Sequence, residues 1–374
     1  MIQWGASHAP DKRHNSTMTP ISISRPGTIF LCLALCALAI AEDRPVSGKD
    51  VAGFEPVDRA VLEFMDRIGC QAGTVAVSED GRLLYSRGYG HGDEAMTKPV
   101  AGDALMRIAS VTKPITAAAV KNVIREKRLS LDTKAFELIA VKPPGGKVAD
   151  SRIHDVTVGH LLEHRGGWDR QTAFDPMFRT EEIERTLKLR RPARPVHVVA
   201  YMLIQPLQFA PGEKSIYSNF GYCVLGRVLE KVMDRPYAAC IRRSVCRPLG
   251  IDDIMLGHGD PNRRHAREVW YPVAEDAFSL EVMDAHGGLI ASAPALCRFL
   301  DAYWISGDRR PVGQQADWIF FGSLPGTTAM VRQRPDGLNI AVLLNGRRDR
   351  HFNEDNDVLK KTIDAAIDKV NAPR

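Results

Sequence analysis

Two stretches near opposite ends of the chain carry strand-forming residues on both sides of a polar turn. In the first, residues 73–88, an Asp-Gly pair at 80–81 separates two such runs. In the second, a Pro-Asp-Gly turn at 335–337 separates the apolar runs 327–334 and 338–344. Glycine tolerates positive φ, so Asp-Gly between apolar runs is a strong hairpin signal. Each stretch is therefore predicted to form a β-hairpin.

The chain between the hairpins has helical rather than strand-like spacing of apolar residues. In residues 222–233, for example, apolar side chains recur every three or four positions, as on one face of a helix. Proline-rich stretches interrupt this region and are predicted to be surface loops, at 142–146 and 191–195. The predicted helices are Ile115–Arg125, Leu187–Tyr201, Tyr222–Met233 and Pro294–Tyr303.

The order of strands, helices and strands again predicts an α+β fold. The expected architecture is an antiparallel sheet built from both chain ends and flanked by helices, with an inserted mainly helical region at about 121–270. Residues 42–374 are expected to form one domain with no internal repeat.

Composition narrows the class of protein. Hydrophobic residues make up 44% of the chain and charged residues 25%, which is ordinary for a soluble globular protein. The net charge is +5, and the segment before residue 42 holds three basic residues and one acid, so the remainder carries +3. Such a small excess of positive charge, scattered among acidic residues, does not indicate a basic surface that binds nucleic acid. No nucleic-acid partner is expected.

Residues 1–41 have the pattern of a secretory signal peptide. Arg25 precedes an apolar run at 29–41 that ends in Ala-Ile-Ala, and this run is too short to span a bilayer as a helix. The precursor would start at Met1 or Met18. The mature protein is expected to be exported, periplasmic or extracellular, without a membrane span.

Five cysteines remain after removal of the signal segment, and none forms a C-x-x-C pair. An odd number leaves at least one thiol unpaired within the chain. A bridge between Cys240 and Cys246 and a set of buried free thiols are the two alternatives.

The candidate chemistry begins at Ser110-Val111-Thr112-Lys113, which opens a predicted helix. A serine at a helix start lies near exposed N–H groups and the positive end of the helix dipole. Lys113, three residues later, falls on the same face and can take the serine proton if it is held neutral. Taken alone, this short motif also fits an N-cap serine with a surface lysine.

A second segment strengthens this hypothesis. Tyr217 and Asn219 form a Tyr-x-Asn in a turn-rich segment directly before a helix. A tyrosine hydroxyl can relay protons, and an asparagine amide can hold a substrate carbonyl.

With these residues the chain resembles the β-lactamase-related serine hydrolases, which include class C β-lactamases, D-alanyl-D-alanine carboxypeptidases and related esterases. The resemblance runs over nearly the whole mature chain and implies a bilobal β-lactamase/transpeptidase-like domain. It rests on five segments in the same order: 107–113 (Arg-Ile-Ala-Ser-Val-Thr-Lys), 161–167 (Leu-Leu-Glu-His-Arg-Gly-Gly), 209–219, 287–293 and 322–345.

The resemblance implies a role for each motif residue. Ser110 would be the nucleophile, Lys113 its base, Tyr217 the proton relay and Asn219 a substrate contact. The implied substrates are small esters, amides or peptides, with no cofactor and no metal.

The chain departs from the family pattern at the third motif. The family has Lys-Thr-Gly or His-x-Gly where this chain has Phe320, Phe321 and Gly322. Phenylalanine cannot donate a hydrogen bond, but Gly322 still permits close backbone approach, and the implied oxyanion hole uses the N–H groups of Ser110 and Ser323. The departure predicts reduced activity or an altered substrate.

The sequence leaves two alternative functions open. It also offers one residue that could replace the polar group missing at Phe320. A catalytically weak or inactive penicillin-binding or ligand-binding module of the same fold is the first alternative. The second is a zinc hydrolase, since His160, Glu163 and His164 match H-x-x-E-H with two histidines four residues apart. His286 is a candidate substitute for the missing polar group, against a simple role in loop packing.

Overall fold

The computed structural model describes residues 44–190, 192–274 and 277–370. The predicted signal segment, with Cys32, Cys36 and both candidate start residues, lies outside the described residues. None of the described helices is long and apolar enough to cross a membrane.

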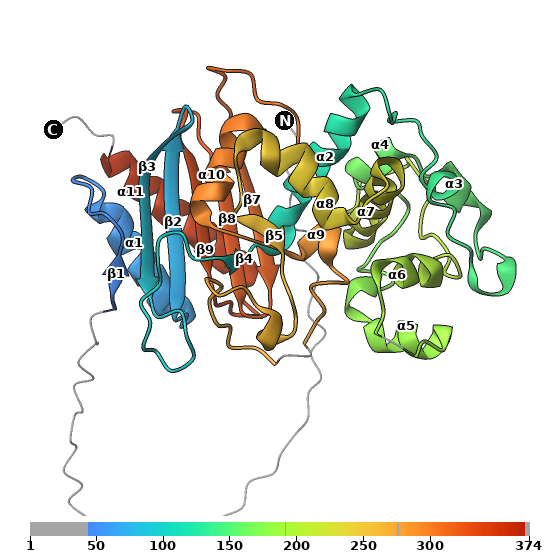
Figure 1. Ribbon diagram of the computed structural model, residues 1–374, viewed down its shortest axis with the longest axis horizontal. Helices are drawn as coiled ribbons and strands as arrows, with labels where there is room; N and C mark the ends of the chain where they lie inside the picture. Colours follow the sequence, from blue (N-terminus) through green and yellow to red (C-terminus); the bar gives the residue numbers. More distant parts are fainter. Residues whose placement is uncertain (1–43, 191, 275–276, 371–374) are drawn as a thin grey trace, which may run out of the picture. The chain divides into compact units, whose positions relative to one another are not determined.

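Six antiparallel strands from both chain ends form the main sheet, as predicted (Figure 1). Strands β2 and β9 pair at its centre, with Gly73 opposite Leu344 and Ser78 opposite Asn339, so the two ends of the chain share one ladder. In spatial order the strands are β1 (Val46–Ser47), β3 (Arg82–Gly90), β2 (Ala72–Glu79), β9 (Asn339–Leu344), β8 (Thr327–Gln333) and β7 (Trp318–Leu324).

Both predicted hairpins are confirmed. Asp80 and Gly81 connect β2 to β3 with φ of 47° and 78°, the two positive angles that a tight hairpin turn requires. Gly337 takes φ of 94° in the turn between β8 and β9, where Arg334 N donates to Leu338 O at 2.8 Å.

Both faces of the sheet are covered by helices. On one face, Val75, Val77 and Val342 pack against α1 (Glu55–Ile68) and α11 (Phe352–Val370). On the other face, the smaller Ala76 and Ala341 pack toward α2 (Thr112–Arg125) and α10 (Ala293–Ala302). Because both faces are buried, β9 is apolar at every position after Asn339, and the centre of β2 is the apolar run 75–77.

The remaining helices gather at the other end of the domain, around α7 (Figure 1). A second, three-stranded sheet has the spatial order β4 (Met106–Arg107), β6 (Leu289–Ala291) and β5 (Ile254–Leu256), and β4 precedes α2 along the chain. The remaining elements are β4 (Met106–Arg107), α3 (Ala135–Ile139), α4 (Val158–Leu162), α5 (Thr180–Leu187), α6 (Pro195–Met202), α7 (Asn219–Met233), α8 (Tyr237–Ile241), β5 (Ile254–Leu256), α9 (Asp284–Gly287) and β6 (Leu289–Ala291), with short 3₁₀ turns and one π turn between them.

One predicted helix is wrong, and of the two alternatives for the cysteines the buried free thiols are confirmed. The helix predicted over Leu187–Tyr201 is wrong: α5 ends at Leu187, Lys188 adopts a left-handed φ of 52°, and α6 begins only at Pro195. Proline lacks an N–H, so it starts a helix readily but does not continue one. The five cysteines are all free and buried, so the Cys240–Cys246 bridge is not formed.

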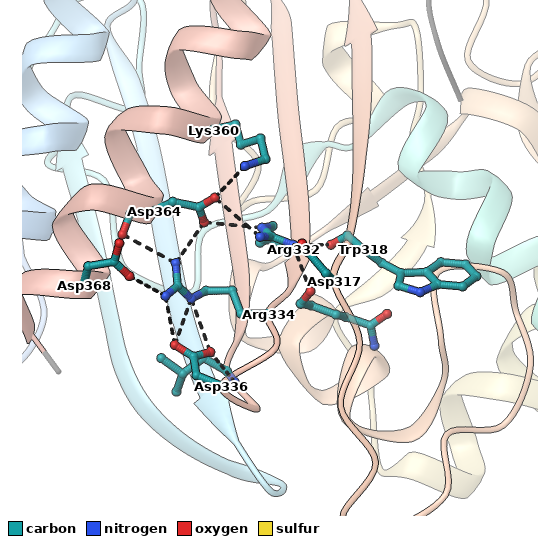
Figure 2. Close-up of polar contacts among 10 residues, drawn as sticks. Asp317, Trp318, Arg332, Arg334, Asp336, Lys360, Asp364 and Asp368 are labelled. Carbon is teal, nitrogen blue, oxygen red and sulfur yellow. Dashed lines mark hydrogen bonds and ion pairs between the residues drawn. The ribbon is translucent and has the colours of Figure 1, made fainter. Parts of the chain in front are cut away.

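A cluster of charges attaches α11 to the sheet (Figure 2). Arg332 of β8 is only 5% exposed and its Nε donates to Asp364 Oδ1 at 3.3 Å. Arg334 reaches the same carboxylate at 3.1 Å and also Asp368 at 2.6 Å. Lys360, one helical turn before Asp364, donates to its Oδ2 at 2.8 Å. Asp364 is thus the common acceptor of three cations.

We expect Asp364→Asn to destabilise the protein by about 2 kcal/mol, less than the 3–5 kcal/mol typical of broken buried pairs because Asp364 is partly exposed. Burial opposes ionisation of Asp364, but its bonds to Lys360 and Arg332 hold its pKa below the usual value. The stabilisation is therefore present above the unfolded pKa of about 3.9 and is lost as the pH falls through the folded pKa.

Urea unfolding at pH 7 and at about pH 3 measures this difference, which should shrink at the lower pH. Asp368→Asn is the matched control: its side chain is 66% exposed, so its ion pair should contribute less than about 1 kcal/mol. Equal effects of the two substitutions would contradict the central role of Asp364.

Candidate active site

Ser110 lies in a tight turn between β4 and α2. The turn is a 3₁₀ segment, Ala109–Val111, and Ala109 takes a left-handed φ of 46°, which is uncommon for a residue with a side chain. Ala109 and Val111 are buried, whereas Ser110 keeps partial exposure. The sharp turn therefore presents the serine hydroxyl at the surface of a packed core.

Lys113 follows in the first turn of α2 and is 1% exposed. Its Nζ lies 3.1 Å from Ser110 Oγ and donates to the backbone carbonyl of His286 at 2.8 Å. Burial lowers the pKa of Lys113 well below its usual value, although the carboxylate of Asp175 acts in the opposite direction. A neutral amine at this position can accept the proton of Ser110.

Tyr217 approaches the same hydroxyl from the segment before α7, and its OH donates to Ser110 Oγ at 2.7 Å. The ring of His164 stacks on the tyrosine ring with centroids 4.7 Å apart. Burial raises the pKa of Tyr217 to about 12, partly offset by the bond to Ser110. Tyr217 therefore holds its proton at neutral pH and can donate it.

Asn219 begins α7 and is 7% exposed. Its Nδ2 donates to Asp175 Oδ2 at 2.6 Å, and Asp175 lies 3.8 Å from the guanidinium of Arg170. That guanidinium lies 5.0 Å from the ring centroid of Tyr217. Arg170 and Asp175 thus form a charged pair beside the predicted residues. No motif in the sequence singles them out, because both lie in an irregular loop.

Gly322 brings β7 against the turn that carries Ser110. A Cβ at this position would lie 2.1 Å from the carbonyl oxygen of Ile108 and 3.1 Å from the backbone nitrogen of Ser110. β7 is the edge strand of the sheet, so part of its backbone has no strand neighbour. Backbone N–H groups from the turn and from the strand edge can therefore face one bound oxyanion.

Side chains alternate between the two faces of β7, so Phe320 and Ser323 point to opposite faces. Phe320 is two residues from Gly322 and therefore shares its face, the one toward Ser110, where Phe320 packs on the core under α2. Ser323 points to the opposite face, and its Oγ accepts a hydrogen bond from Arg347 at 3.3 Å. Only the backbone of Ser323 can therefore serve the site.

His286 takes a different place from the one considered for it. Its backbone carbonyl, rather than its imidazole, contacts Lys113, and its buried Nε2 has no hydrogen-bond partner within the described ranges. His286 thus contributes to the site through its backbone carbonyl, which holds Lys113.

His160 and His164 are not arranged as the zinc-hydrolase alternative requires. α4 ends at Leu162, and His164 has a left-handed φ of 56°, so the two histidines do not share one helical face. His160 Nδ1 accepts from Thr157 N at 3.4 Å and His164 Nδ1 accepts from Ser218 N at 3.0 Å. The segment instead supports Tyr217 through the stacked ring of His164.

The fold is of the β-lactamase/transpeptidase type, and comparison with known sequences agrees. The profile of the Beta-lactamase family matches residues 57–358, so the chain belongs to this family. Among curated relatives, esterase EstB of Burkholderia gladioli is 31% identical over 235 residues, which is 60% of this chain and 58% of the esterase. The "Probable fimbrial assembly protein FimD, serogroup H1" of Dichelobacter nodosus is 32% identical over 177 residues, 47% of this chain and 42% of that protein.

The alignments span about half the length of these curated relatives. Solved structures share the fold at lower identity. The D-alanine carboxypeptidase AmpC of Burkholderia cenocepacia superposes with a TM-score of 0.62 at 18% identity, covering 84% of this chain and 99% of that one. The D-amino acid amidase of Ochrobactrum anthropi SV3 gives 0.61 at 20% identity, covering 83% and 99%.

We expect Gly322→Ala to lower the rate of any reaction at Ser110 by about 10²-fold or more, because the new Cβ pushes the strand edge away from the turn. Initial rates of ester hydrolysis measure the effect, with circular dichroism to verify folding. Gly259→Ala is the matched control, since its Cβ would meet no atom closer than 3.5 Å. Unchanged turnover in Gly322→Ala would refute the importance of this contact.

Arg170 and Asp175, the charged pair near Tyr217, should shift the pH dependence of activity in opposite directions. Burial is the main cause of the low pKa of Lys113, but Arg170 lowers it further and Asp175 raises it. Loss of activity toward acid pH should reflect protonation of Lys113. Arg170→Gln should move this acid limb of kcat/KM to higher pH, and Asp175→Asn should move it to lower pH.

Full pH–rate profiles of the two variants test this expectation. Arg185→Gln on α5, an exposed arginine outside the site, is the charge-matched control and should leave the profile unchanged. Shifts in the same direction for both variants would show that Lys113 is not the group that titrates.

Proposed function

We propose that this protein is a serine hydrolase that cleaves small esters or amides through an acyl-enzyme on Ser110. The observation that carries the proposal is the pair of contacts to one hydroxyl: Lys113 Nζ at 3.1 Å and Tyr217 OH at 2.7 Å from Ser110 Oγ. A buried base and a proton donor on the same oxygen are what nucleophilic acyl transfer needs.

The reaction follows from these positions. Ser110 Oγ gives its proton to neutral Lys113 and attacks the substrate carbonyl carbon. The carbonyl oxygen becomes an oxyanion between the N–H of Ser110 and the edge of β7 at Ser323. The tetrahedral intermediate collapses as Tyr217 protonates the leaving group, and Lys113 returns a proton to Tyr217. Water then releases the acyl group by the same steps in reverse.

The relatives support hydrolysis in general. They are named esterase, D-alanyl-D-alanine carboxypeptidase and D-amino acid amidase, and these names describe hydrolysis of ester, peptide and amide bonds. The signal-like pattern of residues 1–41 supports export, to the periplasm or beyond the cell. We infer that the natural substrates are small esters, amides or peptides.

Phe320 supports a second candidate function. On the face toward Ser110 it offers an apolar ring where the family has a polar group, so deacylation could be slow enough for the protein to act as a penicillin-binding or ligand-binding module. A β-lactam that labels Ser110 without turnover of any ester would favour this candidate.

Replacing Ser110 by Ala should lower hydrolysis of p-nitrophenyl acetate by more than about 10³-fold and abolish labelling by a fluorophosphonate probe. Lys113→Ala should do nearly the same, because groups that act as a unit have non-additive effects. Ser130→Ala, an exposed serine beyond α2, is the control. Unchanged turnover in Ser110→Ala, or labelling at another serine, would refute the proposal.

A further inference from the structure

The carbonyl oxygen that holds Lys113 belongs to α9, a helix of only one turn, Asp284–Gly287. Two successive carbonyls of this turn accept hydrogen bonds from side chains of α2. Ala285 O accepts from Thr116 Oγ1 at 2.7 Å, and His286 O accepts from Lys113 Nζ at 2.8 Å. The position of α9 therefore sets the direction from which the amine of Lys113 is held.

This direction matters because a neutral amine has only one lone pair. When Lys113 donates one N–H to His286 O, rotation about its Cε–Nζ bond is limited, and the lone pair can point at Ser110 Oγ, 3.1 Å away. Proton transfer depends on this alignment. A small shift of the carbonyl therefore slows the reaction even when the side chain of Lys113 stays in place.

α9 depends on tertiary contacts for its position. A single helical turn is unstable on its own, because fixing the first turn costs more conformational entropy than its hydrogen bonds repay. Gly287 within the turn and Gly288 after it weaken it further. α9 packs against α2, α7 and α8 (Figure 1). It lies so close to α7 that a Cβ at Gly226 would be 2.6 Å from the Cβ of Ala285.

A buried ion pair joins α9 to α7 at the same place. Arg227 Nη2 donates to Asp284 Oδ2 at 2.5 Å, and both side chains are only 7% exposed. The other carboxylate oxygen, Oδ1, accepts from Ala285 N, so Asp284 connects the arginine to the backbone of the turn. Glu230, three residues after Arg227 on α7, lies 2.6 Å from its Nε and holds the guanidinium from a second side.

Stability alone does not account for this pair. Removing two charges from water costs about as much free energy as their attraction returns, and packed apolar residues often stabilise a protein as well or better. What the pair does provide is a fixed direction, because the hydrogen bond between Arg227 and Asp284 forms in one relative position of α7 and α9.

We propose that Arg227 and Asp284 are positioning residues for the reaction at Ser110. Their ion pair fixes α9, and the carbonyl of His286 in turn orients the amine of Lys113. The inference rests on the proposed hydrolysis at Ser110. It extends the site beyond the groups that contact the serine hydroxyl, to a charged pair on two other helices.

Labelling of Ser110 by a fluorophosphonate tests this role. The maximal rate constant of labelling, kinact, depends on how readily the serine is deprotonated, whereas the half-saturating probe concentration, KI, depends on binding. We expect Asp284→Asn to lower kinact by about 10-fold or more and to leave KI within about 3-fold. Circular dichroism and urea unfolding give the folded fraction under the labelling conditions, and kinact is corrected by that fraction.

Two substitutions at Arg227 keep the test decisive if Asp284→Asn folds poorly. Arg227→Lys retains a cation that can reach Asp284, so kinact should stay within about 3-fold, whereas Arg227→Met has a similar length without the charge and should lose about 10-fold. The double variant Arg227→Met, Asp284→Asn should label no more slowly than the slower single variant, because residues that act as a unit have non-additive effects.

Asp364→Asn is the matched control. It also removes a carboxylate that pairs with a buried arginine, Arg332, but it lies on α11, which covers the other face of the main sheet. Its corrected kinact should stay within about 2-fold of the wild-type value, because the effects of distant substitutions are independent.

The inference is overturned if the corrected kinact of Asp284→Asn equals that of the wild type. It is also overturned if Arg227→Lys and Arg227→Met slow labelling equally, or if the effects of the two single substitutions multiply in the double variant. Each of these results leaves hydrolysis at Ser110 standing, because the wild-type protein still labels there. Absence of labelling at Ser110 in the wild-type protein would instead refute the proposed function itself.

Discussion

The close approach of strand β7 to the turn at Ser110 is the constraint on which the site depends. Without a side chain at Gly322, the strand edge can lie against the carbonyl of Ile108 and the nitrogen of Ser110. This contact joins the sheet, made from both chain ends, to the start of α2. It also brings backbone donors from two distant segments to one point, and such preorganised donors are usually the largest catalytic term in acyl transfer.

Burial shifts the pKa values of Lys113 and Tyr217, the two residues that contact Ser110 Oγ. Lys113 is enclosed under His286 and Tyr217, so water does not stabilise its charge and its pKa falls. The same environment raises the pKa of Tyr217 and keeps its proton in place. A lysine with a lowered pKa and a tyrosine with a raised pKa thus contact one hydroxyl, with no help from a polar residue at Phe320. In the proposed mechanism, Lys113 and Tyr217 together carry out the proton transfers.

Several features of the site were accessible from sequence because they are local. Ser110 and Lys113 are separated by one helical turn, so their contact follows from the helix period, and Asp-Gly turns predict both hairpins. Tyr217 was indicated by its motif, but its hydrogen bond to Ser110 joins residues 107 positions apart and depends on how α7 packs against α2. The helix expected over 187–201 failed because apolar spacing continues across a loop that Lys188 and Pro195 interrupt.

The sequence by itself determined the order of the elements and the identity of the groups able to do chemistry, since hairpin turns, helix periodicity and short motifs are encoded by neighbouring residues. Only the tertiary structure decided which of these groups meet. It placed Arg170 and Asp175 beside Tyr217, turned Ser323 toward Arg347 and separated His160 from His164. These outcomes depend on packing between distant segments, where the pleat of a strand or the end of a helix sets the direction of each side chain.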